Sequence, residues 1–241
     1  MKSKLIVWVL LTLSFCNKTF ARVLIANNNS NRPIGHYPQI QGAVTAANSG
    51  DTIYVVGSPE IYALVTLSFT NKALVFIGAG YRPQKDINFS SKIGDINAAN
   101  PFQNTGTGNN IKILGFEIFG IIGKDGTSCC GGDGWEIAYN KFNGANAGIG
   151  LGNNCNVHDN YFEVAANGAI GLYVTGNNTS QIHNNIFSRS VGTNGFLIAE
   201  GSLHHPTGTS IYNNHFLSAA GGNVFGDING AIVDNNLFYG Y

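Results

Sequence analysis

The sequence predicts an all-β solenoid, a chain wound into stacked coils of short strands. One phrase recurs five times: an aliphatic residue, two variable residues, asparagine, any residue and phenylalanine. The asparagines stand at 140, 160, 185, 214 and 236, so they step by 20, 25, 29 and 22 residues. Such a period is too short for a packed helix in every unit. The alternative is an Asn-rich low-complexity region, but disorder would not keep three residue types in phase. The copies are Ile137–Asn140–Phe142, Val157–Asn160–Phe162, Ile182–Asn185–Phe187, Ile211–Asn214–Phe216 and Val233–Asn236–Phe238.

Each position of the phrase has a physical role in such a coil. The apolar residues around it alternate with period two, as half-buried strands require. Asparagine tolerates the left-handed backbone region, so it suits a sharp bend between strands. Its amide both donates and accepts, which predicts an asparagine ladder from coil to coil. The phenylalanine two residues later should point inward and stack on its counterpart in the next coil.

These coils resemble the right-handed parallel β-helix proteins, the pectate-lyase-like superfold, over residues 38–241. The segment Gln39–Asn48 has apolar residues at helical spacing, and Asp51–Val56 follows as a strand. Together they resemble the helical cap and first coil of secreted β-helix proteins, in which the helix covers an exposed end. The expected fold class is therefore all-β: a right-handed parallel β-helix solenoid with an N-terminal capping α-helix.

Residues 1–21 have the features of a secretion signal peptide. Two lysines lie in the first four residues, Leu5–Phe15 is apolar, and Ala21 offers a small residue at the cleavage position. Eleven apolar residues are too few to span a bilayer, which needs about 20. Lipidation at Cys16 is the weaker alternative, because bulky Phe15 precedes it. The expected location is secreted or at the cell surface.

Composition suits a turn-rich β architecture and excludes several partners. The 241 residues include 32 Gly and 32 Asn, 44% are hydrophobic and only 11% are charged. Without Lys2, Lys4 and Lys18 of the leader, 10 basic and 13 acidic residues give a net charge of −3. That balance offers no steering field for nucleic acid or an anionic membrane. No other segment is apolar enough to be a transmembrane segment.

The domain boundaries follow from these features. Residues 22–37 are Asn-rich and are expected to be an irregular lead-in, and residues 38–241 form the solenoid domain. The sequence stops at Tyr241, three residues after the last phenylalanine of the phrase, with no helix to cover the final coil. We expect either a C-terminally truncated fragment or self-association through that coil.

The strands after each phrase predict a candidate binding face. In pectate-lyase-like proteins a comparable face carries the saccharide groove, and here Leu197 is expected to point outward on it. Tyr173 would stack on a sugar ring, and the adjacent histidines near a glutamate would move protons. The simpler alternative is a solvated loop with an incidental His-His pair. The candidate substrate-binding residues are Tyr173, Glu200, His204, His205 and Asp227.

A second set of polar residues follows the inward aliphatic positions. His158 and His183 should point outward and stack one coil apart, and Tyr212 and Asp234 hold the same position in the next coils. One interpretation is a metal or acid-base cluster. The other, favoured because no further carboxylate is evident there, is a plain stack of side chains on the outer surface.

Three cysteines would remain after export, and an exported chain permits disulfides. Cys155 should stack near Trp135, and Cys129 or Cys130 would reach it from the preceding loop. The pairing is open: a structural bridge or buried thiols are both favoured over redox or metal chemistry. The spacing matches no zinc pattern.

The catalytic motifs that the resemblance suggests are missing. The sequence lacks the Asn-Thr-Asp, Asp-Asp, His-Gly and Arg-x-Lys segments of polygalacturonase-like enzymes, and Asp133–Ile137 does not match the pectate-lyase segment. Calcium, the metal that such lyases use, has no clear acidic cluster here, and no cofactor is evident. We therefore expect binding of extracellular polysaccharide, with lyase or glycoside hydrolase activity not established. The alternative is a non-catalytic structural or adhesive surface module.

Overall fold

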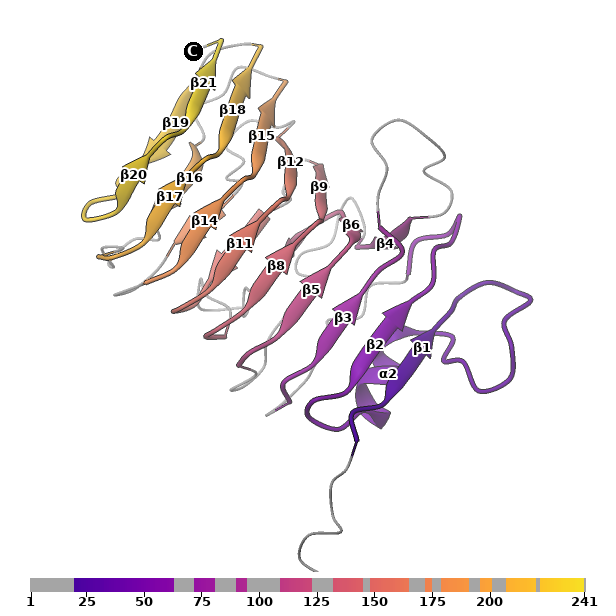
Figure 1. Ribbon diagram of the computed structural model, residues 1–241. Helices are drawn as coiled ribbons and strands as arrows, with labels where there is room; N and C mark the ends of the chain where they lie inside the picture. Colours follow the sequence, from indigo (N-terminus) through magenta and orange to yellow (C-terminus); the bar gives the residue numbers. More distant parts are fainter. Residues whose placement is uncertain are drawn as a thin grey trace, which may run out of the picture.

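The computed structural model describes residues 20–62, 72–80, 90–94, 109–122, 132–144, 148–164, 172–174, 179–190, 196–200, 207–219 and 222–240. They form a parallel β-helix in which strands far apart in the sequence lie side by side (Figure 1). Every strand pair is parallel, from β1 with β2 to β18 with β21. The predicted solenoid class is confirmed.

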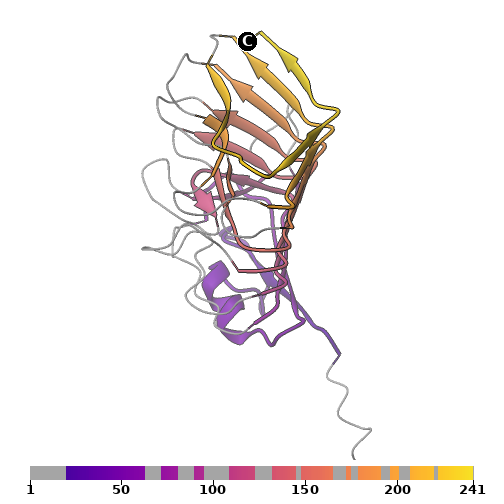
Figure 2. The same ribbon diagram turned by 90° about the vertical axis from the view of Figure 1, so that its left-hand side faces the viewer.

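The described strands form three sheets that make the walls of the solenoid, which Figure 2 shows from a second side. The nine-stranded sheet contains β1 (Val23–Ala26), β2 (Thr52–Val55), β3 (Val75–Ile77), β5 (Lys112–Leu114), β8 (Glu136–Ala138), β11 (Asn156–His158), β14 (Gln181–His183), β17 (Ser210–Tyr212) and β20 (Ile232–Asp234). The seven-stranded sheet contains β4 (Ser91–Ile93), β6 (Phe116–Ile118), β9 (Lys141–Gly144), β12 (Tyr161–Val164), β15 (Ile186–Arg189), β18 (His215–Ser218) and β21 (Leu237–Tyr239). The five-stranded sheet contains β7 (Ile121–Ile122), β10 (Gly148–Leu151), β13 (Leu172–Val174), β16 (Phe196–Glu200) and β19 (Asn223–Gly226).

From β5 onward, a sharp bend joins each strand of the nine-stranded sheet to the strand of the seven-stranded sheet that follows it in the chain. The sequence analysis placed the phrase asparagine in the left-handed conformation at this bend, and that placement is wrong by one residue. The residue just before each asparagine has positive φ, and Gly115 serves in the same place one coil earlier, with φ 78°. Asparagine and aspartate dominate these positions because their short polar side chains tolerate the left-handed region. The residues are Tyr139, Asp159, Asn184, Asn213 and Asn235, with φ between 49° and 59°.

The phrase asparagines form a continuous buried row beside the bend. Asn160 Oδ1 accepts from both the backbone N–H and the side-chain Nδ2 of Asn140, at 3.0 and 3.1 Å. The same pair of bonds links Asn160 to Asn185 and Asn185 to Asn214. Each Nδ2 also reaches the carbonyl of the inward aliphatic residue one coil back, as Asn185 does to Val157 O at 2.9 Å. Amides with complementary donors and acceptors can be buried without an unsatisfied group.

The phrase phenylalanines form the single file that the sequence predicted. Phe142, Phe162 and Phe187 stack with centroids 4.6 and 4.5 Å apart and interplanar angles of 5° and 6°. Phe216 and Phe238 extend the file at 5.0 and 5.1 Å. The inward aliphatic residues Ile137, Val157, Ile182 and Ile211 are fully buried beside them. The core is thus a column of side chains repeated from coil to coil.

The N-terminal end is covered as predicted by one helix, α2 (Ile40–Ala46), which buries Ile40, Ala43 and Val44 (Figure 1). The expectation of an irregular lead-in over residues 22–37 is corrected. Val23–Ala26 forms β1, whose four residues pair in register with β2. The short apolar run Val-Leu-Ile-Ala has enough β propensity to extend the sheet, although three asparagines directly follow it. Within the described part of the chain, no helix is long and apolar enough to cross a membrane.

Removal of one ring from the middle of the file tests the core. Phe187→Ala should lower the free energy of unfolding by about 3–5 kcal/mol, because stacked neighbours cover both faces of that ring. The measurement is equilibrium urea denaturation.

Phe238→Ala is the matched control. That ring stacks on Phe216, meets Phe225 edge-on and is 45% exposed, so its removal should cost clearly less. An unchanged midpoint for Phe187→Ala would contradict the central place of Phe187.

Candidate functional site

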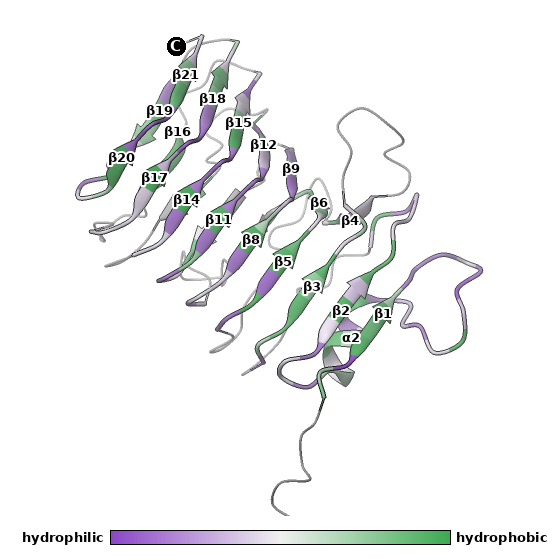
Figure 3. Ribbon diagram, in the orientation of Figure 1, coloured by the Kyte–Doolittle hydropathy of each residue, from purple (hydrophilic) through white to green (hydrophobic). Residues whose placement is uncertain are grey.

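The outward-facing side chains in the middle of the nine-stranded sheet form two rows, which we call the outer strip. They lie on either side of the buried aliphatic residue of each strand. In Figure 3, hydrophilic residues mark β5, β11 and β14, whereas β1 and β3 are hydrophobic. The first row is Lys112, Glu136, Asn156, Gln181 and Ser210. The second row is Ala138, His158, His183, Tyr212 and Asp234.

The second row carries a stack of three rings, as the sequence predicted. His158 and His183 lie with centroids 5.1 Å apart and 7° between their planes. His183 and Tyr212 follow at 4.9 Å and 9°. Asp234 pairs with Tyr212 in the next coil, so the ring stack ends there. Parallel strands in register hold the rings face to face.

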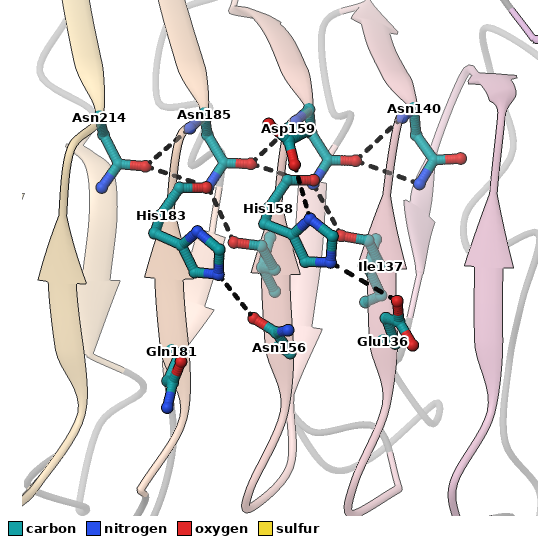
Figure 4. Close-up of polar contacts among 12 residues, drawn as sticks. Glu136, Ile137, Asn140, Asn156, His158, Asp159, Gln181, His183, Asn185 and Asn214 are labelled. Atoms are coloured by element: carbon teal, nitrogen blue, oxygen red, sulfur yellow. Dashed lines mark hydrogen bonds and ion pairs between the residues drawn. The ribbon is translucent and has the colours of Figure 1, made fainter.

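Each ring also contacts the first-row side chain of the preceding coil. His183 Nε2 lies 3.1 Å from Asn156 Oδ1, and Tyr212 Oη donates to Gln181 Oε1 at 3.3 Å. His158 Nε2 lies 3.6 Å from Glu136 Oε1 (Figure 4). The same diagonal contact is therefore made three times with three different pairs of residues. Sequence reasoning missed this, because the first row has no repeated residue type.

His158 lies between two carboxylates. Its Nδ1 is 2.8 Å from Asp159 Oδ2, on the opposite side of the ring from Glu136. The sequence analysis found no carboxylate beside the histidines and so missed both acids. Their signal was adjacency: Glu136 directly precedes a phrase aliphatic residue, and Asp159 directly precedes a phrase asparagine.

Two side chains of the outer strip have pKa values that differ from their ordinary values. The pKa of Glu136 is lowered, first by the hydrogen bond from Lys112, whose Nζ lies 2.6 Å from Oε2. The pKa of His183 is lowered, first by burial of the ring and then by repulsion from His158. The structure thus favours an ionised Glu136 and, two coils further along the strip, a neutral His183 at neutral pH.

Tyr139 occupies an unusual position next to this stack. It holds the left-handed conformation, with φ 59°, where the next coils have aspartate or asparagine. A bulky residue there costs about 1–2 kcal/mol. Its ring, 56% exposed, meets the edge of His158 with centroids 5.7 Å apart and planes at 86°. Strained backbone conformations of this kind are often found at functional sites. Tyr139, at the end of the strip, is therefore a candidate for mutagenesis.

The binding face predicted from the sequence is only partly described. The backbone of the five-stranded sheet aligns Tyr173 with Ala199 and Val174 with Glu200, and Ala199 with Gly226, just before Asp227. Three predicted residues therefore come from neighbouring strands: Tyr173 from the middle of β13, Glu200 from the end of β16 and Asp227 from just after β19. Asp227 is exposed and accepts a hydrogen bond from Asn229. His204 and His205 lie outside the described residues.

One side chain on that face differs from expectation. Leu197 was predicted to point outward, but it is fully buried, as is Ile198 beside it. Period-two alternation therefore does not hold in β16, so alternation alone is a poor guide to which residues this sheet exposes.

Cys155 is a free thiol in the core beside Trp135. Its side chain is 2% exposed, and burial raises the pKa of its thiol to about 11. Its Sγ lies 3.5 Å from the carbonyl oxygens of Gly132 and Asn153. Of the two predicted alternatives the structure has the buried thiol. The other partners considered, Cys129 and Cys130, lie outside the described residues.

Neither a search for metal-binding clusters nor comparison with known proteins indicates a chemical activity for the outer strip. Within the residues that the structure describes, no group of three or more His, Cys, Asp and Glu side chains is placed to hold a metal ion. Comparison with protein-family models, curated proteins and solved structures found no match.

The lowered pKa of His183 predicts a pH dependence of stability. The folded state binds this proton less readily than the unfolded chain, in which a histidine titrates at about 6.5. The stability contributed by neutral His183 is present above that pH and is lost as the pH falls below it. Thermal unfolding midpoints should therefore drop as the pH falls below about 6.5.

His183→Gln should flatten this drop, whereas the control His215→Gln, at an exposed position on β18, should leave it unchanged. If the two variants follow the same pH profile, burial of His183 does not control this part of the stability.

Proposed function

We propose that this is an exported protein that binds extracellular polysaccharide along the outer strip. The observation that carries the proposal is the diagonal contact between the two rows, repeated on three successive coils. Neighbouring strands lie about 4.7–4.9 Å apart, so polar groups recur along the solenoid at that interval. A linear polysaccharide is the common extracellular polymer that presents hydroxyl groups at a regular interval of similar length.

The groups of the strip suit hydroxyl ligands. Each of the amides of Asn156 and Gln181 offers two donors and a carbonyl with two acceptor sites. The ring contacts engage only the carbonyl oxygens of these amides, at 3.1 and 3.3 Å. One such contact fixes the orientation of an amide and leaves most of its hydrogen-bonding capacity for a ligand. Side chains that are ordered before binding lose less conformational entropy when they bind.

The charges of the strip favour a neutral polysaccharide over a uronate polymer. Within the strip Lys112 is paired with Glu136, and on the seven-stranded sheet Lys141 of β9 is paired with Glu163 of β12 at 3.3 Å. Asp159 and Asp234 add negative charge, and the lowered pKa of His183 disfavours a compensating cation there. An anionic chain would meet like charge, which opposes association.

The binding experiment compares retention on gels containing neutral or acidic polysaccharides. One of these gels should retain the wild type. On that gel, the double substitution Asn156→Ala, Gln181→Ala should weaken binding about tenfold, since each lost hydrogen bond is worth about 0.5–1.5 kcal/mol. The control His215→Gln changes an exposed residue of the seven-stranded sheet and should bind like the wild type.

Two outcomes would redirect the proposal. If the double variant binds as the wild type does, the ligand does not lie on the outer strip. The face that contains Tyr173, Glu200 and Asp227 would then be the next candidate.

The same samples are assayed for reducing and unsaturated products. Products that disappear in Glu200→Gln would support cleavage by a hydrolase or lyase instead of binding alone.

A second candidate function is a non-catalytic structural or adhesive module that self-associates through its last described coil. It is favoured by exposed apolar side chains on β20 and β21: Ile232 is 60% exposed, Leu237 54% and Tyr239 73%. Burial of such side chains against another chain would be favourable.

Sedimentation velocity over a dilution series tests this alternative. Association should weaken on dilution and should be lost in Tyr239→Lys. The matched control His215→Lys adds the same charge at an exposed position on the neighbouring strand β18. A wild type that sediments as a monomer at every concentration would contradict it.

A further inference from the structure

Asp51 is a buried carboxylate at the N-terminal end of the solenoid, and its partners come from two places in the chain. Its side chain is 2% exposed. Oδ1 accepts the backbone N–H of Arg22 at 2.8 Å. Oδ2 accepts Nε and Nη2 of Arg22 at 3.1 and 2.7 Å, and the backbone N–H of Asn48 at 2.8 Å. A buried charge requires such a set of partners, and three of these four bonds come from Arg22.

Arg22 follows the residue at which the leader is predicted to end. Ala21 is the small residue at that position, and Phe20 before it is 85% exposed. Arg22 itself is fixed in place, since its carbonyl accepts the N–H of Thr52 at 2.8 Å, just before β1 pairs with β2. Phe20, Ala21 and Arg22 line an open pocket together with Asn48–Asp51. The fold therefore holds the nitrogen of Arg22, and not that of a neighbouring residue, against a buried carboxylate.

We propose that the Ala21–Arg22 peptide bond is a proteolytic processing site, and that Asp51 receives the α-ammonium group which cleavage creates at Arg22. The step is a hydrolysis by an endopeptidase of the export pathway. The carbon–nitrogen bond breaks, and the oxygen of water joins the carbonyl carbon of Ala21. The nitrogen of Arg22 takes a hydrogen from water and is protonated at neutral pH, with no change of oxidation state.

Cleavage at this bond strengthens a contact that already exists. The neutral N–H that lies 2.8 Å from Asp51 Oδ1 becomes a charged donor, and charge-assisted hydrogen bonds are about twice as strong as neutral ones. The pocket beside Phe20 and Ala21 leaves space for the other hydrogens of the ammonium group. Cleavage one residue earlier would place the new charge on Ala21 and leave an ordinary amide facing Asp51. Only cleavage between Ala21 and Arg22 therefore places the new ammonium group against Asp51.

The titration of Asp51 is consistent with this role. Hydrogen bonds from Arg22 lower the pKa of Asp51 to about 2, so the carboxylate is charged at every pH at which the protein would be exported. An ordinary α-amino group titrates at about 7.7–8.0, and a nearby carboxylate raises that value. The contribution of the ammonium to stability is therefore present below about pH 8 and is lost as the pH rises through the raised pKa.

The inference rests on the export part of the proposed function and not on polysaccharide binding. The test expresses the full chain with its leader in a secreting host and determines the N-terminal residue of the exported protein by sequencing and intact mass. Arg22 is the expected N-terminus. Its α-amino pKa, measured from the pH dependence of acylation, should be about 1–3 units above the ordinary value. The shift should vanish in Asp51→Asn.

Asp133→Asn is the matched control, because Asp133 also accepts a backbone N–H, that of Asn153, but lies far along the chain. Asp51→Asn also weakens the contacts with Asn48 and the Arg22 side chain, so a second measurement uses the wild-type protein alone. Its thermal midpoint should fall between about pH 7.5 and 10 with a free amine, and should fall less once the amine is acetylated.

Three results would overturn the inference: an exported chain that begins at another residue, an ordinary α-amino pKa, or identical pH profiles for the free and acetylated forms. None of these measurements includes a polysaccharide, and the retention assay does not involve Arg22 or Asp51. Failure of one proposal is therefore distinguishable from failure of the other.

Discussion

The structure depends on one requirement, that the backbone groups at each bend find partners away from water. The bend between the nine-stranded and seven-stranded sheets leaves a backbone N–H in the interior of every coil. The carbonyl of an asparagine in the next coil accepts it, as Asn160 does for Asn140 at 3.0 Å. A buried donor without a partner would cost about 1–3 kcal/mol. Since four of these asparagines are at most 2% exposed, the row both permits the bends and fixes the alignment of one coil on the next.

That alignment extends to the inside of the seven-stranded sheet and the outside of the nine-stranded sheet. Inside, the phenylalanine two residues after each asparagine is set directly over the next, with planes within 12° of parallel along the file. Outside, the residue two positions before each asparagine is set over its counterpart, which stacks His158, His183 and Tyr212. The diagonal contacts of the outer strip follow from the same register. A surface that repeats at the strand spacing is therefore a consequence of the core, and only the chemistry of its side chains is free to vary.

This explains which features could be predicted from the sequence. The file of rings and the histidine stack were predictable because identical or similar residues recur at fixed offsets from the phrase asparagine. The left-handed residue was misplaced by one position, since Asn and Asp fill both places in most coils and Tyr139 conceals the pattern. Glu136 and Asp159 were missed because a contact across coils depends on three-dimensional register and not on a repeated letter. Strand β1 was missed because four apolar residues within an Asn-rich stretch give a weak periodic signal.

The two proposals concern different parts of a structure in which each coil contacts only its neighbours. In a solenoid, stability is close to a sum of unit and nearest-neighbour terms, so a coil at an end has one stabilising interface where an inner coil has two. At this end, β1 and its neighbour β2 have α2 and the Arg22–Asp51 contact. An added charge on Arg22 would strengthen the unit that has fewest partners and would leave the geometry around His158 unchanged. Processing would then increase the stability of the N-terminal end of the solenoid, while the outer strip would determine what the protein binds.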